Sequence, residues 1–193
     1  ASIALSNVSV SGAITISLGS GVGTLGASGL HAIKGITIDA SKFGGSMDLN
    51  GVSASGVTIS LGTVGNISAS SIISSTTFTL DGAAAASSNA TLSQLDASGN
   101  AAITLGSGAG AFTIGSASAA GTFTLDGSNS NAAISIAKLS ASGTVSLVTG
   151  VNGTISAGAV VITGTNGGFT LDASNATSIA VNLGAAVSVG NVD

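Results

Sequence analysis

The chain has 193 residues, enough for a continuous core, and its formal net charge of −4 comes from a charged content of only 5%, well below that of ordinary soluble domains. Three lysines and no arginine cannot replace the counterions along a phosphate backbone, so this composition excludes nucleic-acid binding. The absence of cysteine excludes a disulfide framework and a thiolate metal site.

Apolar residues make up 44% of the chain but aromatic residues only 3%, so we expect a thin core of small aliphatic side chains. A mean hydropathy of +0.68 is incompatible with intrinsic disorder, which requires low hydrophobicity. Gly, Ser, Thr or Asn interrupts every apolar cluster within a few residues. We therefore expect no membrane span, since a spanning helix needs about 20 consecutive apolar residues.

A short motif, apolar then hydroxyl then apolar, recurs along the whole chain. Its period of two places both apolar side chains on one face of a strand and the hydroxyl on the other. Successive copies follow one another at a nearly constant spacing, as the structural repeats of a solenoid do. The eight copies are Ile14-Thr15-Ile16, Ile36-Thr37-Ile38, Val57-Thr58-Ile59, Phe78-Thr79-Leu80, Ile103-Thr104-Leu105, Phe123-Thr124-Leu125, Val145-Ser146-Leu147 and Phe169-Thr170-Leu171.

A second apolar column recurs with spacings that alternate between short and long. The alternation predicts two unlike half-repeats of about 22 residues in a unit of about 44. If each half-repeat forms one coil, the chain is an all-β, parallel β-solenoid of about nine coils and a single domain over residues 1–193. An antiparallel β-sandwich is the competing fold, and the nearly constant period disfavours it. The column consists of Val8, Leu25, Val52, Ile67, Leu95, Ile114, Leu139 and Ile155.

An aspartate follows the motif in alternate copies. At the end of a strand, an aspartate accepts hydrogen bonds from backbone amides and forms an Asx turn, which is the preferred interpretation here. Carboxylates are also hard oxygen ligands, so a calcium site is the alternative. A distance of about 10 Å separates residues two coils apart in one column, which is too far for two of these aspartates to share one calcium ion. These candidate residues are Asp39, Asp81, Asp126 and Asp172.

The central threonines predict an exposed column that is a candidate binding surface. A solvent-facing ladder of threonines favours β-structure in its own right. As a ligand-binding surface, the column is compatible with an ice-binding face, although the motif provides one threonine rank per coil rather than two. The residues are Thr15, Thr37, Thr58, Thr79, Thr104, Thr124 and Thr170.

The sequence offers no constellation for catalysis. His31 is the only histidine, and it has no cysteine, glutamate or neighbouring acid with which to form a triad or a zinc site. Paired aspartates could hydrolyse glycosides, but such sites usually add arginine, lysine and aromatic side chains that bind sugar. We therefore expect a protein that is not an enzyme, with no cofactor unless calcium binds.

The segments Gly121-Thr122-Phe123-Thr124-Leu125-Asp126-Gly127 and Val52-Ser53-Ala54-Ser55-Gly56-Val57-Thr58-Ile59 are typical of the chain's style. Over its full length, the chain resembles the repetitive Gly/Ala/Ser/Thr-rich regions of bacterial surface-layer proteins and large secreted adhesins. The resemblance implies an extracellular, cell-surface structural protein that associates with itself into a layer, fibre or matrix, often with calcium. The alternative is a binding module, either an adhesin stalk with a cell-surface glycan as partner or an ice-binding face.

Overall fold

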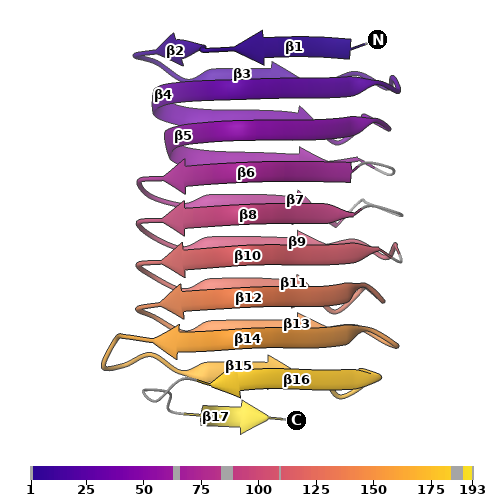
Figure 1. Cartoon of the computed structure of the whole chain (residues 1–193), viewed down its shortest axis with the longest axis vertical. Coiled ribbons are helices and arrows are strands. Elements are labelled where there is room, and N and C mark those ends of the chain that lie inside the picture. The colour runs from indigo at the N-terminus through magenta and orange to yellow at the C-terminus, as the bar shows by residue number, and fades with distance from the viewer. Residues whose placement is uncertain (1, 63–65, 84–88, 109, 184–188, 193) are drawn as a thin grey trace.

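The computed structural model describes residues 2–62, 66–83, 89–108, 110–183 and 189–192. All regular structure in these residues is β, and every strand pairing among them is parallel. The chain winds into a β-solenoid of about eight turns whose equivalent residues lie about 22 residues apart (Figure 1). This confirms the expected solenoid with nearly the expected number of coils. The competing antiparallel sandwich is wrong, because residues one coil apart pair in parallel register.

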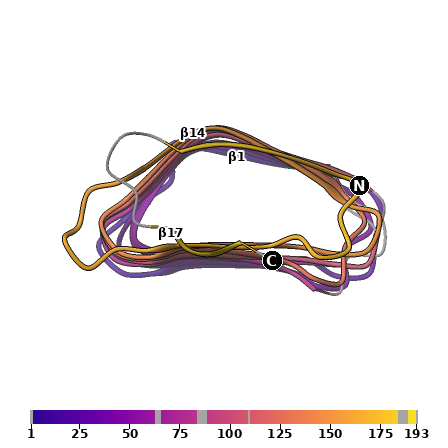
Figure 2. The same ribbon diagram turned by 90° about the horizontal axis from the view of Figure 1, so that it is seen from below.

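Each coil has a front strand and a back strand joined by corners (Figures 1 and 2). Strands β4 (Thr24–Ala40) and β5 (Ser46–Leu61) run without interruption from the front to the back. The other front strands are β1 (Ser2–Ser6), β2 (Ser9–Val10), β6 (Asn66–Ser74), β8 (Ala90–Ala97), β10 (Ala111–Ala119), β12 (Ala133–Ala141), β14 (Thr154–Ile162) and β16 (Ser178–Leu183). The other back strands are β3 (Ile14–Ser17), β7 (Phe78–Gly82), β9 (Ala101–Leu105), β11 (Phe123–Gly127), β13 (Val145–Thr149), β15 (Phe169–Asp172) and β17 (Val189–Val192).

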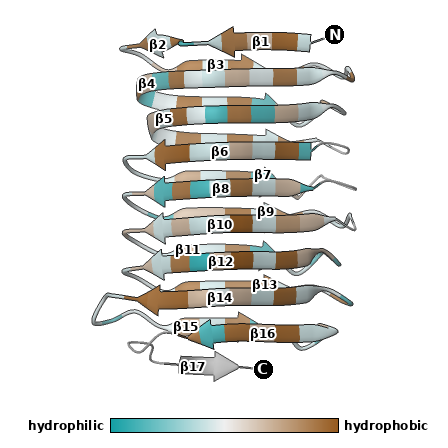
Figure 3. Cartoon of the chain, in the orientation of Figure 1, coloured by the Kyte–Doolittle hydropathy of each residue, from teal (hydrophilic) through white to brown (hydrophobic). Residues whose placement is uncertain are grey.

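Buried and exposed residues alternate along the strands. Hydropathy varies along the strands in bands (Figure 3). The front strands interrupt this alternation once with two successive outward residues, which breaks the period of two where these strands bend (Figure 2). In the first three coils, a residue with positive φ occupies this position: Asn7 (54°), Gly29 (64°) and Gly51 (74°). Glycine and asparagine are the residues that tolerate this conformation, so the local sequence suits the bend.

The core explains why two coils make one repeat. Residues stacked in register in successive coils form columns, and from β7 onward one inward column of the back sheet alternates large and small side chains: Phe78, Ala101, Phe123, Val145 and Phe169. In the first three coils this column holds Ile14, Ile36 and Val57. Because each phenylalanine lies between smaller neighbours, successive coils cannot be identical. The repeat of two coils expected from the sequence is therefore visible in the packing.

A second inward column, at the other end of the back strands, alternates in the opposite sense. It reads Leu61, Gly82, Leu105, Gly127 and Thr149, so leucines stack over glycines. The coils with phenylalanine in the first column have glycine or Ala173 here, and these coils also carry three of the four aspartates, Asp81, Asp126 and Asp172. Each coil from β7 onward thus has a bulky residue in one of the two columns and a small residue in the other, and the next coil has the reverse arrangement.

The second apolar column expected from the sequence combines different structural positions. Leu25, Ile67 and Ile155 belong to one inward column, Ile114 belongs to a second, and Val8, Val52, Leu95 and Leu139 belong to a third that also contains Leu30. The coil length is nearly constant, but the predicted column takes its residues from different positions in successive coils. The distance in sequence between its successive members is therefore alternately short and long. The alternation of unlike coils is real, but it resides in the back strands.

The two buried glycines of the second column make a testable prediction. A Cβ atom at Gly127 would lie 2.9 Å from the carbonyl oxygen of Val148, and one at Gly82 would lie 2.9 Å from that of Thr104. Because both partners are backbone atoms, we expect Gly127→Ala to lower the free energy of unfolding by about 1–3 kcal/mol in urea denaturation. Gly12→Ala is the control, since a Cβ atom there meets nothing within 4 Å. Equal stability of the two variants would contradict the tight packing at this column.

Asparagine side chains extend the backbone ladder at the corners of the coils. The backbone amide of Asn89 donates to Oδ1 of Asn66 (3.0 Å), and the amide of Ala111 donates to Oδ1 of Asn89 (2.8 Å). At another corner, the amide of Thr122 donates to Oδ1 of Asn100 (2.9 Å). These bonds satisfy amides where the chain turns and the strand ladder stops.

Candidate functional site

The predicted threonines form an outward column on the back sheet. Strand pairing brings together Thr15, Thr37, Thr58 and Thr79, and it brings Thr124 and Thr170 into the same column through Ala102 and Ser146. Their side chains are exposed or half-buried. The first four coils thus present an unbroken threonine rank.

Thr104 does not belong to this column. It pairs with Asp81 on one side and Asp126 on the other, two positions further along the strand than the threonine rank. In β9 the residues equivalent to Phe78-Thr79-Leu80 are Ala101-Ala102-Ile103, which contain no hydroxyl. The packing of Ala101 and Ile103 sets the register here, which explains why the step from Thr79 to Thr104 is the longest between successive central hydroxyl residues, Ser146 included.

All four predicted aspartates lie in one outward column, each near the end of its strand, β4, β7, β11 or β15. The column alternates them with Ser17, Ser60, Thr104 and Val148 in the other coils. Each aspartate Oδ1 accepts a hydrogen bond from the backbone amide two residues later. The donors are Ser41 (3.0 Å), Ala83 (3.0 Å), Ser128 (2.9 Å) and Ser174 (3.4 Å). Each aspartate therefore makes the hydrogen bond that is typical of an Asx turn.

The turns at Asp39 and Asp172 each add a hydrogen bond from the serine hydroxyl two residues later, and the shorter of these two bonds is at Asp39. The Oδ1 of Asp39 accepts this hydrogen bond of 2.6 Å from the Ser41 hydroxyl. The Ser41 side-chain hydrogen bond lowers the pKa of Asp39 below the usual 3.8, the Ser41 backbone amide adds to this, and the charge of Lys42 contributes least. Hydrogen bonds to the charged form explain this direction, because the carboxylate accepts them and the protonated acid loses them.

We expect Ser41→Ala to raise the pKa of Asp39 toward its ordinary value, because the largest cause of the shift is removed and the backbone amide remains. A carboxyl whose folded pKa is lowered stabilises the fold above its unfolded pKa, and this contribution is lost as the pH falls through the folded pKa. The variant should therefore lose less stability on acidification than the parent below the ordinary aspartate range. Carboxyl-detected NMR titration measures this pKa directly. An unchanged pKa of Asp39 in the variant would show that the Ser41 hydroxyl does not lower it.

Within the described residues, no three acids, histidines or cysteines approach closely enough to hold a metal ion. Aspartates two coils apart are separated by about 10 Å along the column, too far to share one ion. Calcium binding at Asp39, Asp81, Asp126 and Asp172 therefore stays a prediction, tested below by chelation.

The back face carries a second outward rank beside the threonines, which the motif alone did not reveal. The two ranks are two positions apart on each strand, about 7 Å, and neighbouring coils follow at about 4.8 Å. The sheet beneath them is flat in cross-section (Figure 2). We call this surface the flat face; its ranks are the threonine column and the column of Ser17, Asp39, Ser60, Asp81, Thr104, Asp126, Val148 and Asp172.

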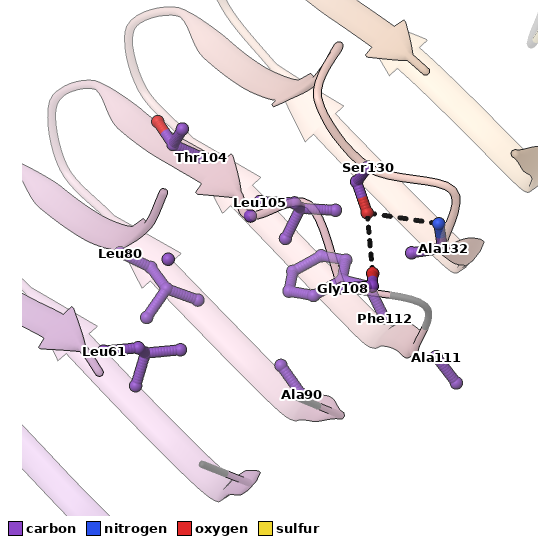
Figure 4. A pocket seen from close by; sticks show the side chains of 12 residues that line it. Leu61, Leu80, Ala90, Thr104, Leu105, Gly108, Ala111, Phe112, Ser130 and Ala132 are labelled. Carbon is purple, nitrogen blue, oxygen red and sulfur yellow. Dashed lines mark hydrogen bonds between the residues drawn. The ribbon is translucent and has the colours of Figure 1, made fainter. Parts of the chain in front are cut away.

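An enclosed space lies in the core between β7, β9 and β10 (Figure 4), and it is lined by Leu61, Leu80, Phe112 and their neighbours. Its volume of about 20 Å³ suits about one water molecule. Ser130 borders it, accepting a hydrogen bond from the amide of Ala132 (3.1 Å) and donating to the carbonyl of Gly108 (3.5 Å). This space is a small packing void beside Gly82 and too small for a substrate.

No helix among the described residues has the length and apolarity needed to cross a membrane. Comparison of the chain with protein-family models, with curated proteins and with solved structures finds no match.

Proposed function

We propose that the chain is an extracellular structural protein that associates with itself into a surface layer, fibre or matrix. The observation that carries this proposal is the repeated register of the coils: each coil presents to the next the same parallel backbone ladder and the same inward columns. In such a solenoid, stability accumulates through contacts between neighbouring coils, so added coils extend both the core and the ladder.

The outermost coils leave aliphatic side chains exposed that their neighbours bury. Ile3 is 46% exposed while Leu25, its partner in register, is fully buried, and Ile179 is 48% exposed while its partner Ile155 is 1% exposed. In the described residues, β1 pairs along one edge only. A further coil can add to such an edge, whether it comes from a continuation of this chain or from another copy.

The front face favours lateral packing of rods. The outward side chains of β10, β12 and β14 are Ser, Thr, Ala, Gly and Val apart from Lys138, their one charged member. Short side chains let two sheets approach to about 10 Å, and few charges need to be desolvated. The flat face is less suited to pairing with its own copy, because aspartates would face aspartates.

The proposal is tested by negative-stain electron microscopy and sedimentation of the purified protein, first with calcium and then with EGTA. We expect ordered fibres or sheets, and their loss in EGTA would make the aspartates calcium ligands as well as turn formers. The double variant Ser118→Glu/Ser156→Glu places charge on the front face and should reduce lateral order, whereas the double variant Thr58→Glu/Thr170→Glu on the flat face is its matched control. Monodisperse single rods under both conditions would refute self-association of this segment.

A second candidate function is a binding module, an adhesin stalk or an ice-binding face. The flat face favours it, because two ranks of polar side chains on a rigid sheet form a regular array where the motif indicated one rank. Thermal hysteresis of the parent, abolished by Thr37→Leu/Thr58→Leu and retained after Ser53→Leu on the front face, would support ice binding. Absence of hysteresis in the parent would refute it.

A further inference from the structure

The part of the front strands that follows their bend has a surface pattern of its own. Its outward residues form a separate facet of the solenoid (Figure 2), which we call the front facet. In β6, β8, β10, β12 and β14, the only large aliphatic side chains that are exposed are Ile73 (45%) and Val161 (37%), and both lie on this facet. They belong to one outward column, which reads Ile73, Asp96, Ser118, Ser140 and Val161.

The only charged residues of these five strands lie on the same facet. Asp96 is in β8, and Lys138 is in the adjacent outward column of β12, where strand pairing aligns it with Gln94 through Ser116. Two coils, about 10 Å along the rod, separate the two charges, which is too far for an ion pair within one chain. Gln94 Nε2 donates a hydrogen bond of 2.6 Å to Asp96 Oδ2. No hydrogen bond among the described residues uses Asp96 Oδ1, Gln94 Oε1 or Lys138 Nζ, so each of these atoms can bind a partner.

The order of these residues is symmetric about the central strand, β10. A twofold axis parallel to the strands at the level of β10 places a second copy face to face with the first and turns its rod in the opposite direction. The coil of β6 then lies opposite that of β14, and β8 lies opposite β12. Ile73 therefore faces Val161 of the second copy, and Gln94 with its bound Asp96 faces Lys138 of the second copy. Each of these contacts occurs twice, and Ser118 faces its own equivalent.

We propose that the front facet binds the front facet of a second copy in antiparallel orientation about this axis. A patch that is complementary to itself is what a twofold-symmetric interface requires, whereas a different partner would impose no symmetry on it. Other registers bring like charges together: with the axis at β8 or β12, Asp96 or Lys138 faces its own equivalent, and parallel rods place both aspartates at one level. The facet is narrow and its ion pairs are exposed, so the contact is weak and is screened by salt. This inference rests on the proposed self-association and names the contact that begins it.

Charge exchange tests the proposed contact, measured as the dimer dissociation constant by sedimentation equilibrium at low ionic strength. Asp96→Lys and Lys138→Asp each place like charges opposite one another, and we expect either variant to weaken dimerisation at least about tenfold. Asp96→Lys/Lys138→Asp reverses both charges and should restore dimerisation, which only a second copy can explain because the two residues are too far apart within one chain. Asp48→Lys and Lys34→Asp make the same changes of net charge at exposed positions outside the facet, and both should dimerise like the parent.

Cross-linking tests the orientation of the pair. The chain has no cysteine, so Ser118→Cys supplies a single thiol at the twofold axis, where a short bismaleimide should join it to its own equivalent. Ser53→Cys is the matched control, because Ser53 lies in the same column three coils from β10. Antiparallel rods separate the two copies of Ser53 by six coils, about 29 Å, so no cross-link should form there.

Failure of the exchanged variant to dimerise, or an equal loss in the two controls outside the facet, would overturn the proposed contact. Cross-linking of Ser53→Cys as readily as of Ser118→Cys would also overturn it, in favour of parallel rods. The outcome is separable from the proposed layer or fibre. Dimers that obey the charge exchange but never grow contradict the layer alone, and layers that assemble unchanged in both single charge variants contradict only the present inference.

Discussion

Deletion of one coil is expected to leave a less stable protein than deletion of two. Removal of residues 90–111 joins Asn89 to Phe112 and stacks the coil of β7 directly on the coil of β11. Removal of residues 90–133 joins Asn89 to Ile134 and stacks β7 on β13. The second deletion is twice as long, yet it alone preserves the alternation of unlike coils.

The expected difference follows from what meets across each junction. After the deletion of one coil, Phe78 faces Phe123 where Ala101 had separated them, and Gly82 faces Gly127 where Leu105 had filled the space. Overpacking of this kind typically costs about 1–3 kcal/mol, and the unfilled space adds a cavity term. After the deletion of two coils, Phe78 faces Val145 and Gly82 faces Thr149, which reproduces the native sequence of large and small residues.

The charges act in the same direction. In the shorter deletion Asp81 and Asp126 become neighbours at about 4.8 Å, whereas in the longer one Asp81 faces Val148. Like charges directly opposite one another destabilise a sheet. Urea denaturation followed by circular dichroism compares the two free energies of unfolding. If the one-coil deletion is the more stable variant, stability depends on coil number alone and the repeat of two coils has no energetic basis.

The solenoid itself was predictable because its signal is local and repeated. Aliphatic residues on either side of a hydroxyl define a strand with one buried face, and a nearly constant spacing repeated along the chain leaves few folds that can use it. The Asx turns were predictable for the same reason, since an aspartate and the amide two residues later are close in sequence.

The sequence predictions were wrong where the register of a strand depends on the volume of its inward side chains rather than on the type of its outward residues. Thr104 matched the hydroxyl pattern, but Ala101 and Ile103 fill the inward positions of β9 and move the strand by two positions relative to that pattern. The second rank escaped notice because Ser17 and Ser60 stand where other coils have aspartate, and only register equates them. A search for polar residues two positions after each threonine would have found it.

The asparagines at the corners were missed because their partners lie a full coil away. Asn66 and Asn89 are 23 residues apart and act together only once the coils are stacked. Backbone amides at a corner have no partner in a strand ladder, so side chains that can accept a hydrogen bond are needed there. A residue type conventionally assigned to loops therefore takes part in holding successive coils together.

Phe123→Ala is expected to lower the free energy of unfolding more than Gly127→Ala or a substitution of any outward residue. Phe123 is fully buried and lies between Ala101 and Val145 in its column. Neither neighbour can fill the space that the ring leaves, because both are small and fixed in strands. Loss of a buried phenylalanine typically costs about 3–5 kcal/mol. In a solenoid this loss weakens two coil interfaces at once, since each coil is stabilised mainly by its neighbours.

Denaturant unfolding measures the total loss, and amide hydrogen exchange locates it. We expect the largest loss of protection in β9, β11 and β13, whose backbones pair across the altered position. Thr124→Ala is the matched control, because Thr124 is the next residue of the same strand and points outward; its effect should stay within about 0.5 kcal/mol. A loss below about 1 kcal/mol for Phe123→Ala would mean that the column tolerates repacking. In that case the alternation of phenylalanine with smaller residues would reflect sequence history rather than a packing requirement between coils.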